Sequence, residues 1–196
     1  MPIDFVAFTA DRRISGAMPL ADDRLSDMLN SVPRVVLRGA AVGDLVEGGP
    51  PVCGDVTLPV GDLVVVVGTG RRGHESQRRR TDVRRVTIGL GRYVVNGRLH
   101  VPAGDDPLPR SLDPKTVLAG RDVLVPLTEA TITYDCASMA VTEEHETLLV
   151  NRARALWIEV VEEIDQGGDG SEAEAPEDPA LSRTNYIKDF TGSVAD

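Results

Sequence analysis

Arginine is concentrated in one short stretch of the chain, from Gly68 to Arg85. The stretch contains seven arginines and no large apolar residue except Val83: Arg71, Arg72, Arg78, Arg79, Arg80, Arg84 and Arg85. Guanidinium groups bind phosphates in a bidentate fashion, so these side chains suit a contact with nucleic acid. The stretch contains no aromatic residue that would stack on bases. We therefore prefer a solvated basic loop that contacts a protein partner or the acidic end of its own chain, and keep nucleic acid as the alternative.

Residues with catalytic or metal-binding side chains are few and scattered. The chain contains no P-loop, G-x-G-x-x-G, H-E-x-x-H, G-x-S-x-G or C-x-x-C motif. Cys136, Glu143, Glu144 and His145 have the right side chains for a metal, but their spacing is not typical of a zinc site. Cys53 and Cys136 fall in corresponding loops of the two halves, and we expect two unpaired thiols. We therefore expect no catalytic residue, no metal and no cofactor.

Length and composition fit one domain or two small ones. The chain has 196 residues, is 41% hydrophobic and contains only two cysteines, which excludes a disulfide-stapled scaffold. Its longest apolar run, Leu63 to Val67, is far shorter than the ~20 residues that span a bilayer. The start, Met1-Pro2-Ile3-Asp4, is not that of a signal peptide. We therefore expect a cytoplasmic protein with no membrane partner.

Negative charge is concentrated at the C-terminal end. Of the net charge of −10, residues 159–196 carry −9 and residues 1–158 carry −1. Gln166 to Pro179 contains only small, acidic and turn-forming residues after the glutamine, so we expect it to be disordered. Apolar residues return beyond it, and Tyr186, Ile187 and Phe190 share one face of a short helix. This face is either a tethered docking motif for a partner or a helix that packs on its own chain.

The two halves of the chain resemble each other in sequence. Ile14 to Met18 matches Val95 to Leu99 at an offset of 81 residues. Two further blocks match at an offset of 90: Leu37 to Val42 with Leu127 to Ile132, and Leu58 to Val64 with Leu148 to Arg154. These spacings predict a tandem repeat with one insertion between Leu99 and Leu127.

Each half has the pattern strand, strand, short helix, strand, strand. In the first half we expect strands at 5–8, 13–18, 34–42 and 56–67, with a helix near Leu25, Met28 and Leu29 that Asp22 or Asp23 caps. In the second half we expect strands at 86–90, 92–101, 123–134 and 147–161, with a helix at 114–118. The valine runs favour β structure. The apolar run at 63–67 should be buried on both faces, which would place it between the two halves or under the helix of its own half.

The fold class is therefore mainly β with short helices: two tandem repeats of a small four- to five-stranded curled sheet or barrel, with a disordered acidic C-terminal tail. The predicted parts are a first β repeat at 1–67, an Arg-rich loop at 68–85, a second β repeat at 86–164, an acidic linker at 165–180 and a C-terminal motif at 181–196.

Each half of the chain resembles the Sm-like small β-barrels over roughly 60 residues. The segments that carry the resemblance are Gly97-Arg98-Leu99, Val125 to Ala130 and Leu149-Val150-Asn151-Arg152. The resemblance implies two small β-barrels in tandem. It does not imply RNA binding, because Asn151-Arg152 stands where that family has Arg-Gly and no Asp-x-x-x-Asn run precedes Val125. The segment Arg24 to Asn30 also resembles a pattern in bacterial domains without a known activity.

These features favour a non-enzymatic interaction, scaffold or regulatory protein. We expect it to bind a protein partner, or a second copy of itself, through the β repeats and the motif at Tyr186, Ile187 and Phe190. Unfilled edge strands would allow a homo-oligomer. The alternative is a nucleic-acid-associated regulator that uses the loop from Arg71 to Arg85.

Overall fold

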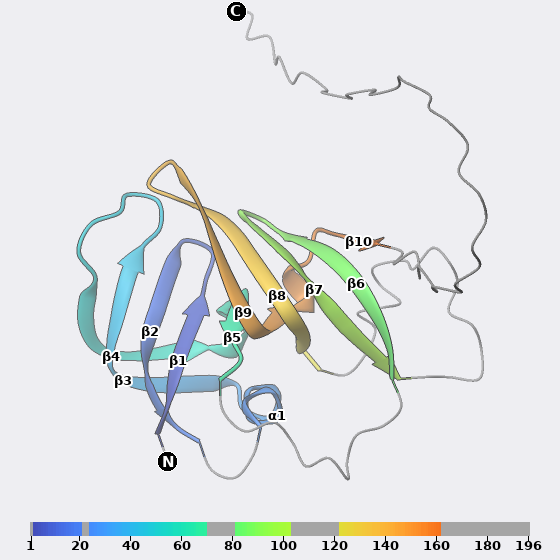
Figure 1. The fold of residues 1–196 in the computed structure, drawn as a ribbon. Helices are drawn as coiled ribbons and strands as arrows, with labels where there is room; N and C mark the ends of the chain where they lie inside the picture. The colour runs from blue at the N-terminus through green and yellow to red at the C-terminus, as the bar shows by residue number, and fades with distance from the viewer. Residues whose placement is uncertain (1, 21–23, 70–80, 103–121, 162–196) are drawn as a thin grey trace, which may run out of the picture. The chain divides into compact units, whose positions relative to one another are not determined.

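The computed structural model describes residues 2–20, 24–69, 81–102 and 122–161. These residues form ten strands and one α-helix (Figure 1). The strands are β1 (Pro2–Phe8), β2 (Arg12–Pro19), β3 (Arg34–Asp44), β4 (Val52–Pro59), β5 (Val65–Val67), β6 (Thr81–Leu90), β7 (Tyr93–Pro102), β8 (Leu124–Cys136), β9 (Met139–Asn151) and β10 (Trp157–Val161). The helix is α1 (Leu25–Ser31). The expectation of a mainly β chain is confirmed for this part of the protein.

All ten strands belong to one antiparallel sheet. Its order is β10-β6-β7-β8-β9-β5-β1-β2-β3-β4, so β10 and β4 are the two ends and the sheet is not closed. We expected each half to form its own curled sheet or barrel, which is wrong because β5 joins the halves. It pairs with β1 on one edge and with β9 on the other. Its three valines are all buried, as the apolar run at 63–67 predicted.

Two predicted strands are each divided by a short turn. The strand expected at 56–67 is interrupted by a 3-10 turn at Val60–Asp62, directly after Pro59. The strand expected at 147–161 is interrupted by a 3-10 turn at Arg152–Arg154, where the Asn151 side chain accepts a hydrogen bond from the Ala153 amide. In each half the turn redirects the chain, so that the last short strand pairs with the first strand of that half.

The helix α1 packs an apolar face against the sheet, as its sequence predicted. Leu25 and Leu29 are buried, and Met28 packs against the same hydrophobic cluster. The helix begins later than expected, with Arg24 at its N-cap and no side-chain cap. The expected caps Asp22 and Asp23, and the helix expected at 114–118, lie outside the described residues. No helix in the described part of the chain is both long and apolar enough to cross a membrane.

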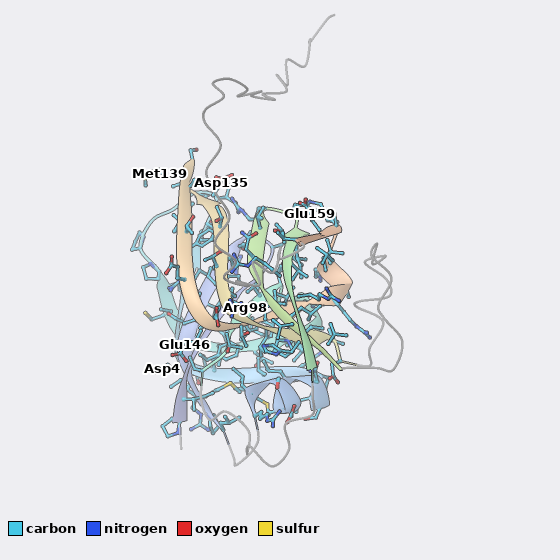
Figure 2. All side chains as sticks on the ribbon, turned by 45° about the vertical axis from the view of Figure 1, so that its right-hand side comes forward. Asp4, Arg98, Asp135, Met139, Glu146 and Glu159 are labelled. Atoms are coloured by element: carbon cyan, nitrogen blue, oxygen red, sulfur yellow. The ribbon has the colours of Figure 1, made fainter. Side chains whose placement is uncertain are left out.

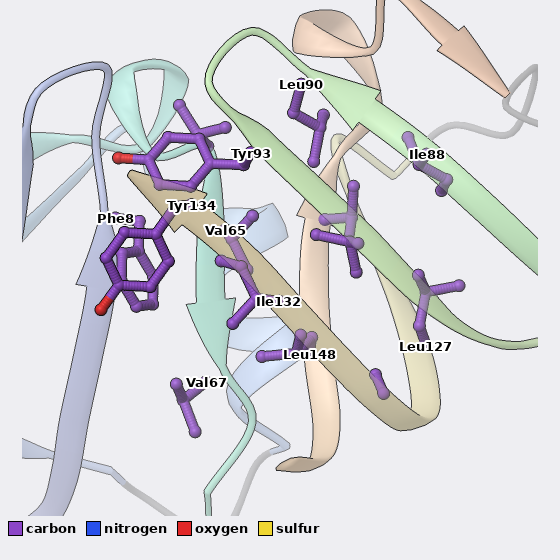
Figure 3. Close-up of a cluster of buried hydrophobic side chains, with 14 of the residues drawn as sticks. Phe8, Val65, Val67, Ile88, Leu90, Tyr93, Leu127, Ile132, Tyr134 and Leu148 are labelled. Atoms are coloured by element: carbon purple, nitrogen blue, oxygen red, sulfur yellow. The ribbon is translucent and has the colours of Figure 1, made fainter. Parts of the chain in front are cut away.

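Two hydrophobic clusters form the core, and each contains residues from both halves of the chain. One combines strands β6 to β9 with Phe8, Val65 and Val67 from the first half (Figure 3). The other lies over strands β1 to β3 and the helix, and includes Leu124 and Leu149 from the second half. Each fully buried Val, Leu, Ile or Phe side chain stabilises the fold by about 1.5–3 kcal/mol. The two halves therefore complete each other's core.

Candidate interaction surface

The junction between β5 and β9 shows how the two halves of the chain bind each other. The pairs are Val65–Val150, Val66–Leu149 and Val67–Leu148, and all six side chains are buried. Backbone bonds of 2.9 Å flank them, from the Asn151 amide to the Val64 carbonyl and from the Gly68 amide to the Thr147 carbonyl. This junction is an edge-to-edge pairing of two strands with apolar side chains on both faces.

Pro126 on β8 determines which way the backbone amide of Leu149 points in this junction. Leu149 pairs with Pro126 of β8 on one side and with Val66 of β5 on the other. Pro126 has no amide hydrogen, so it cannot exchange the two hydrogen bonds of a bonded pair with Leu149. The amide of Leu149 therefore points away from β8 and toward β5.

Two asparagine side chains connect the halves by hydrogen bonds. Asn151 is fully buried, and its Nδ2 donates to the Leu63 carbonyl at 2.7 Å. Asn30, on α1, binds both backbone groups of Leu124: its Nδ2 donates to the carbonyl at 3.1 Å, and its Oδ1 accepts from the amide at 2.9 Å. These side chains satisfy backbone groups at positions where the strand ladder ends.

Three aromatic rings pack together beside the junction. The ring of Phe8 lies 5.7 Å from that of Tyr93 and 5.2 Å from that of Tyr134, between ring centroids. The Tyr93 hydroxyl donates to the Thr9 carbonyl at 2.5 Å. Burial raises the pKa of both tyrosines above the usual 10, and for Tyr134 the hydrogen bond to Glu143 raises it further. Both hydroxyls therefore stay protonated and act as donors.

Glu143 is surrounded by polar groups from both halves. Its carboxylate accepts a hydrogen bond of 2.6 Å from the Tyr134 hydroxyl. It also forms an ion pair with Arg13 Nε at 3.5 Å, and its other oxygen lies 3.3 Å from His145 Nε2. Neither contact has hydrogen-bond geometry at the nitrogen. The arrangement fixes the carboxylate between β2 and the β8–β9 hairpin, whose tip is labelled by Asp135 and Met139 in Figure 2.

The residues considered as metal ligands are spread over two strands. Cys136 lies at the end of β8, whereas Glu143, Glu144 and His145 lie along β9, with Glu144 on the opposite face from its two neighbours. Within residues 2–161, as far as they are described, no group of three or more His, Cys, Asp or Glu side chains is placed to hold a metal. Cys53 and Cys136 are both free thiols, as expected.

The two ends of the sheet expose apolar side chains. On β10 and the residue before it, Leu156 is 74% exposed and Trp157 is 44% exposed. Glu159 labels this strand in Figure 2. On β4, Val52 is exposed and Val56 and Leu58 are only partly buried. Figure 1 shows β4 and β10 on opposite sides of the picture, in agreement with their places in the strand order.

A hollow of about 460 Å³ lies next to β4. Its apolar lining comes from Ile14, Val42, Val56, Leu58 and Val64. Its charged lining includes Arg12 and a pair formed by Arg154 and Asp62, which lie 3.4 Å apart between Nη2 and Oδ1. An apolar floor with charged groups around it is suited to a large apolar side chain or to a flat ring.

The indole of Trp157 covers the backbone of its neighbouring strand. A Cβ atom built on Gly89 would lie 2.1 Å from Trp157 Nε1. Only glycine therefore allows the ring to lie on β6 in this position. Among the residues described at the β10 end of the sheet, this ring is the largest exposed apolar group.

The predicted site residues fall mostly outside this part of the chain. Arg84 and Arg85 lie on β6, because that strand begins at Thr81 and not after the basic stretch as expected. Arg71, Arg72, Arg78, Arg79, Arg80 and the predicted motif Tyr186, Ile187 and Phe190 lie outside the described residues. Of the predicted site residues, the described part of the chain therefore places only Arg84 and Arg85, which are consecutive on β6.

Sequence reasoning singled out the run 63–67, which contains β5, but not its partner strand β9, the two asparagines or the free edges. Trp157 is the only tryptophan of the chain, and it follows a turn, which was the available signal. Asn30 and Asn151 gave no signal, because their partners are backbone groups 94 and 88 residues away in the sequence.

In comparisons with known proteins, the chain matches no family model, no curated protein and no solved structure. The resemblance to Sm-like small β-barrels therefore stays a prediction, whereas the two separate barrels that it implied are wrong, because the described strands form one open sheet.

Proposed function

We propose that this chain is a non-enzymatic, cytoplasmic interaction or scaffold protein, built as a tandem β repeat, that binds protein partners through the edges of its sheet. One observation carries the proposal: the halves of the chain already bind each other edge to edge, through β5 and β9, while β10 and β4 end the sheet. An edge strand with exposed apolar residues is a template for pairing with another chain.

The pairing registers support the tandem repeat. Four residue pairs of the first half each have a counterpart in the second half. They are Val6–Ser15 with Thr87–Asn96, Ile14–Val42 with Val95–Ile132, Val36–Thr57 with Pro126–Leu149, and Ala7–Val66 with Ile88–Ile158. Counterparts differ by 81 residues in the first two strands, by 90 in the third, and by 92 in the fourth and fifth. The offset of 90 expected for the last sequence block is therefore wrong by two residues: the counterpart of Leu58 is Val150.

Details of the backbone support the same correspondence. The Val64 amide donates to the Phe8 carbonyl at 2.8 Å, and the Leu156 amide donates to the Gly89 carbonyl at 2.8 Å. A register shift occurs at Gly16 in β2 and at Gly97 in β7. A Cβ on Gly16 would lie 3.2 Å from the Cβ of Ala40, and one on Gly97 would lie 3.0 Å from the Cβ of Ala130. Both glycines allow the same close approach of two strands.

Capture of partners from a cell extract tests the proposal. The bait is the full chain, with and without nuclease treatment, beside a 1–180 truncation that lacks Tyr186, Ile187 and Phe190. We expect protein that stays bound after nuclease and at high salt, because apolar contacts respond little to ionic strength. Protein lost only from the truncation would support the docking motif. Material removed by nuclease and by salt would contradict the proposal, and would favour a nucleic-acid-associated regulator that uses the loop from Arg71 to Arg85.

A further inference from the structure

We propose that the chain assembles head to tail with further copies of itself, by pairing β10 of one copy with β4 of the next in the register that β5 and β9 use within the chain. The inference rests on the proposed function and names its partner as a second copy. The strand order of the first half is β5-β1-β2-β3-β4, and the second half has the corresponding order β10-β6-β7-β8-β9. Within the chain, β9 of the second half pairs with β5 of the first half. The same step taken once more joins β4 to the β10 of another chain.

The correspondence between the halves fixes the register of the new pairing. Within the chain the pairs are Val65–Val150, Val66–Leu149 and Val67–Leu148. Their counterparts between chains are Trp157–Leu58, Ile158–Thr57 and Glu159–Val56.

The backbone groups of β4 point in the direction that this pairing requires. Thr57 pairs with Val36 of β3 in the way that Leu149 pairs with Pro126 of β8. Because Leu149 directs its amide away from β8, the amide of Thr57 points away from β3 and out of the sheet. By the same correspondence with Val66, the amide of Ile158 points away from β6. Thr57 and Ile158 can therefore exchange two backbone hydrogen bonds.

Residues at the two ends of the sheet are more exposed than their counterparts at the β5–β9 junction. Val64 is 5% exposed and Val65 is fully buried, whereas their counterparts Leu156 and Trp157 are 74% and 44% exposed. On the other edge, Leu148 and Val150 are fully buried, and their counterparts Val56 and Leu58 are only partly so. The same positions are covered at the β5–β9 junction and uncovered at β10 and β4.

The hollow beside β4 lies where the indole of Trp157 would enter. Phe8 corresponds in sequence to Gly89, and the Trp157 ring occupies the space that a side chain at Gly89 would take. In the chain, Phe8 packs on Tyr93 and Tyr134. Their counterparts in the first half are Arg12, which lines the hollow, and Asp44. A guanidinium over an indole face is a favourable cation–π contact.

The junction between chains lacks one feature of the junction within the chain. The counterpart of Asn151 is Pro59, which has neither the amide that binds Val64 nor the side chain that binds Leu63. The interchain contact therefore forms fewer hydrogen bonds, so we expect assembly that is reversible and depends on protein concentration. Since every chain supplies both edges, the contact generates a ring or an open filament.

Two edge-blocking variants of the full chain test the proposal. Thr57→Pro and Ile158→Pro each remove an outward amide and retain the bonds to β3 and β6, while Thr57→Ala and Ile158→Ala keep the amide and are the matched controls. The molar mass is measured by size-exclusion chromatography with light scattering over a concentration series. We expect the wild type and both alanine controls to exceed the 21.0 kDa of one chain as concentration rises.

The decisive sample is an equimolar mixture of the two proline variants. Each variant alone should stay a monomer, because the contact needs both a free β4 and a free β10 and every copy of one variant has the same edge blocked. Mixed, the free β4 of one variant pairs with the free β10 of the other, so the mass should reach that of two chains and no more. If a proline variant fails to fold, Thr57→Lys and Trp157→Lys block the same edges by charge at exposed positions.

Three results would overturn the proposal: a wild type that stays monomeric at every concentration, a single proline variant that dimerises by itself, or a mixture that stays monomeric. The second would show that like edges pair with each other. None of these results removes the proposed function, because partner capture is measured separately. Nuclease-sensitive capture would contradict that function even if the chain self-assembles.

Discussion

Single side chains decide how firmly the two halves hold together. Asn151 is the only buried polar residue among those that the structure describes, and it binds the Leu63 carbonyl and the Ala153 amide at the same time. A buried polar group without a hydrogen-bond partner costs free energy. Replacement of this side chain should leave both backbone groups without a partner and so destabilise the folded chain.

We predict that Asn151→Ala lowers the free energy of unfolding by about 1–3 kcal/mol, because the Leu63 carbonyl and the Ala153 amide lose their partner. Urea denaturation measures the change. Asn96→Ala is the matched control: this asparagine is exposed on β7 and should change the stability by less than about 0.5 kcal/mol. Equal effects of the two substitutions would show that Asn151 does not hold the junction.

Tyr134 makes the stability depend on pH in the alkaline range. Burial raises its pKa in the folded state above the unfolded value, so its contribution is complete below pH 10 and is lost as the pH rises further. We predict that Tyr134→Phe loses less stability than the wild type between about pH 9 and about pH 11. Urea denaturation at the two pH values measures this loss, and equal losses would contradict the buried, protonated hydroxyl.

At the scale of elements, β5 is the strand on which the sheet depends. It is three residues long, yet it pairs with β1 and β9 and contributes side chains to both hydrophobic clusters. The sequence predicted its burial from the unbroken run of apolar residues. The turns that precede β5 and β10 were not predicted, although Pro59, Gly61 and Asp62 are turn-forming residues. Their first amides donate to distant carbonyls, Val60 to Pro33 and Arg152 to Val123, which the local sequence does not reveal.

We predict that Val66→Ala lowers the free energy of unfolding by about 1.5–3 kcal/mol, because this side chain is fully buried between strands of both halves. Val36→Ala is the control, since Val36 on β3 is 56% exposed and should change the stability by less than about 0.5 kcal/mol. Thermal and urea unfolding compare the two variants. A cost at Val66 no larger than that at Val36 would mean that β5 does not join the halves.

At the scale of the whole molecule, the mainly β class followed from the valine runs. The position of the strands followed to within a few residues for most elements, and α1 kept its predicted apolar face. A single sheet in place of two small barrels was not predictable. Edge-to-edge pairing depends on which backbone groups stay unpaired after each half has folded, and the sequence of β5 carries no mark of its partner β9. Unfilled edges were expected, but which strands form them was not predictable for the same reason.

The most direct test of the head-to-tail pairing uses the fluorescence of Trp157, because it is the only tryptophan in the chain and lies on the free edge. Emission and quenching by iodide are recorded while the protein is diluted over several orders of magnitude. We predict that the emission moves to shorter wavelength and quenching falls as concentration rises, in the wild type but not in Thr57→Pro. An emission that does not change with concentration, or that changes equally in Thr57→Pro, would contradict the pairing of β10 with β4.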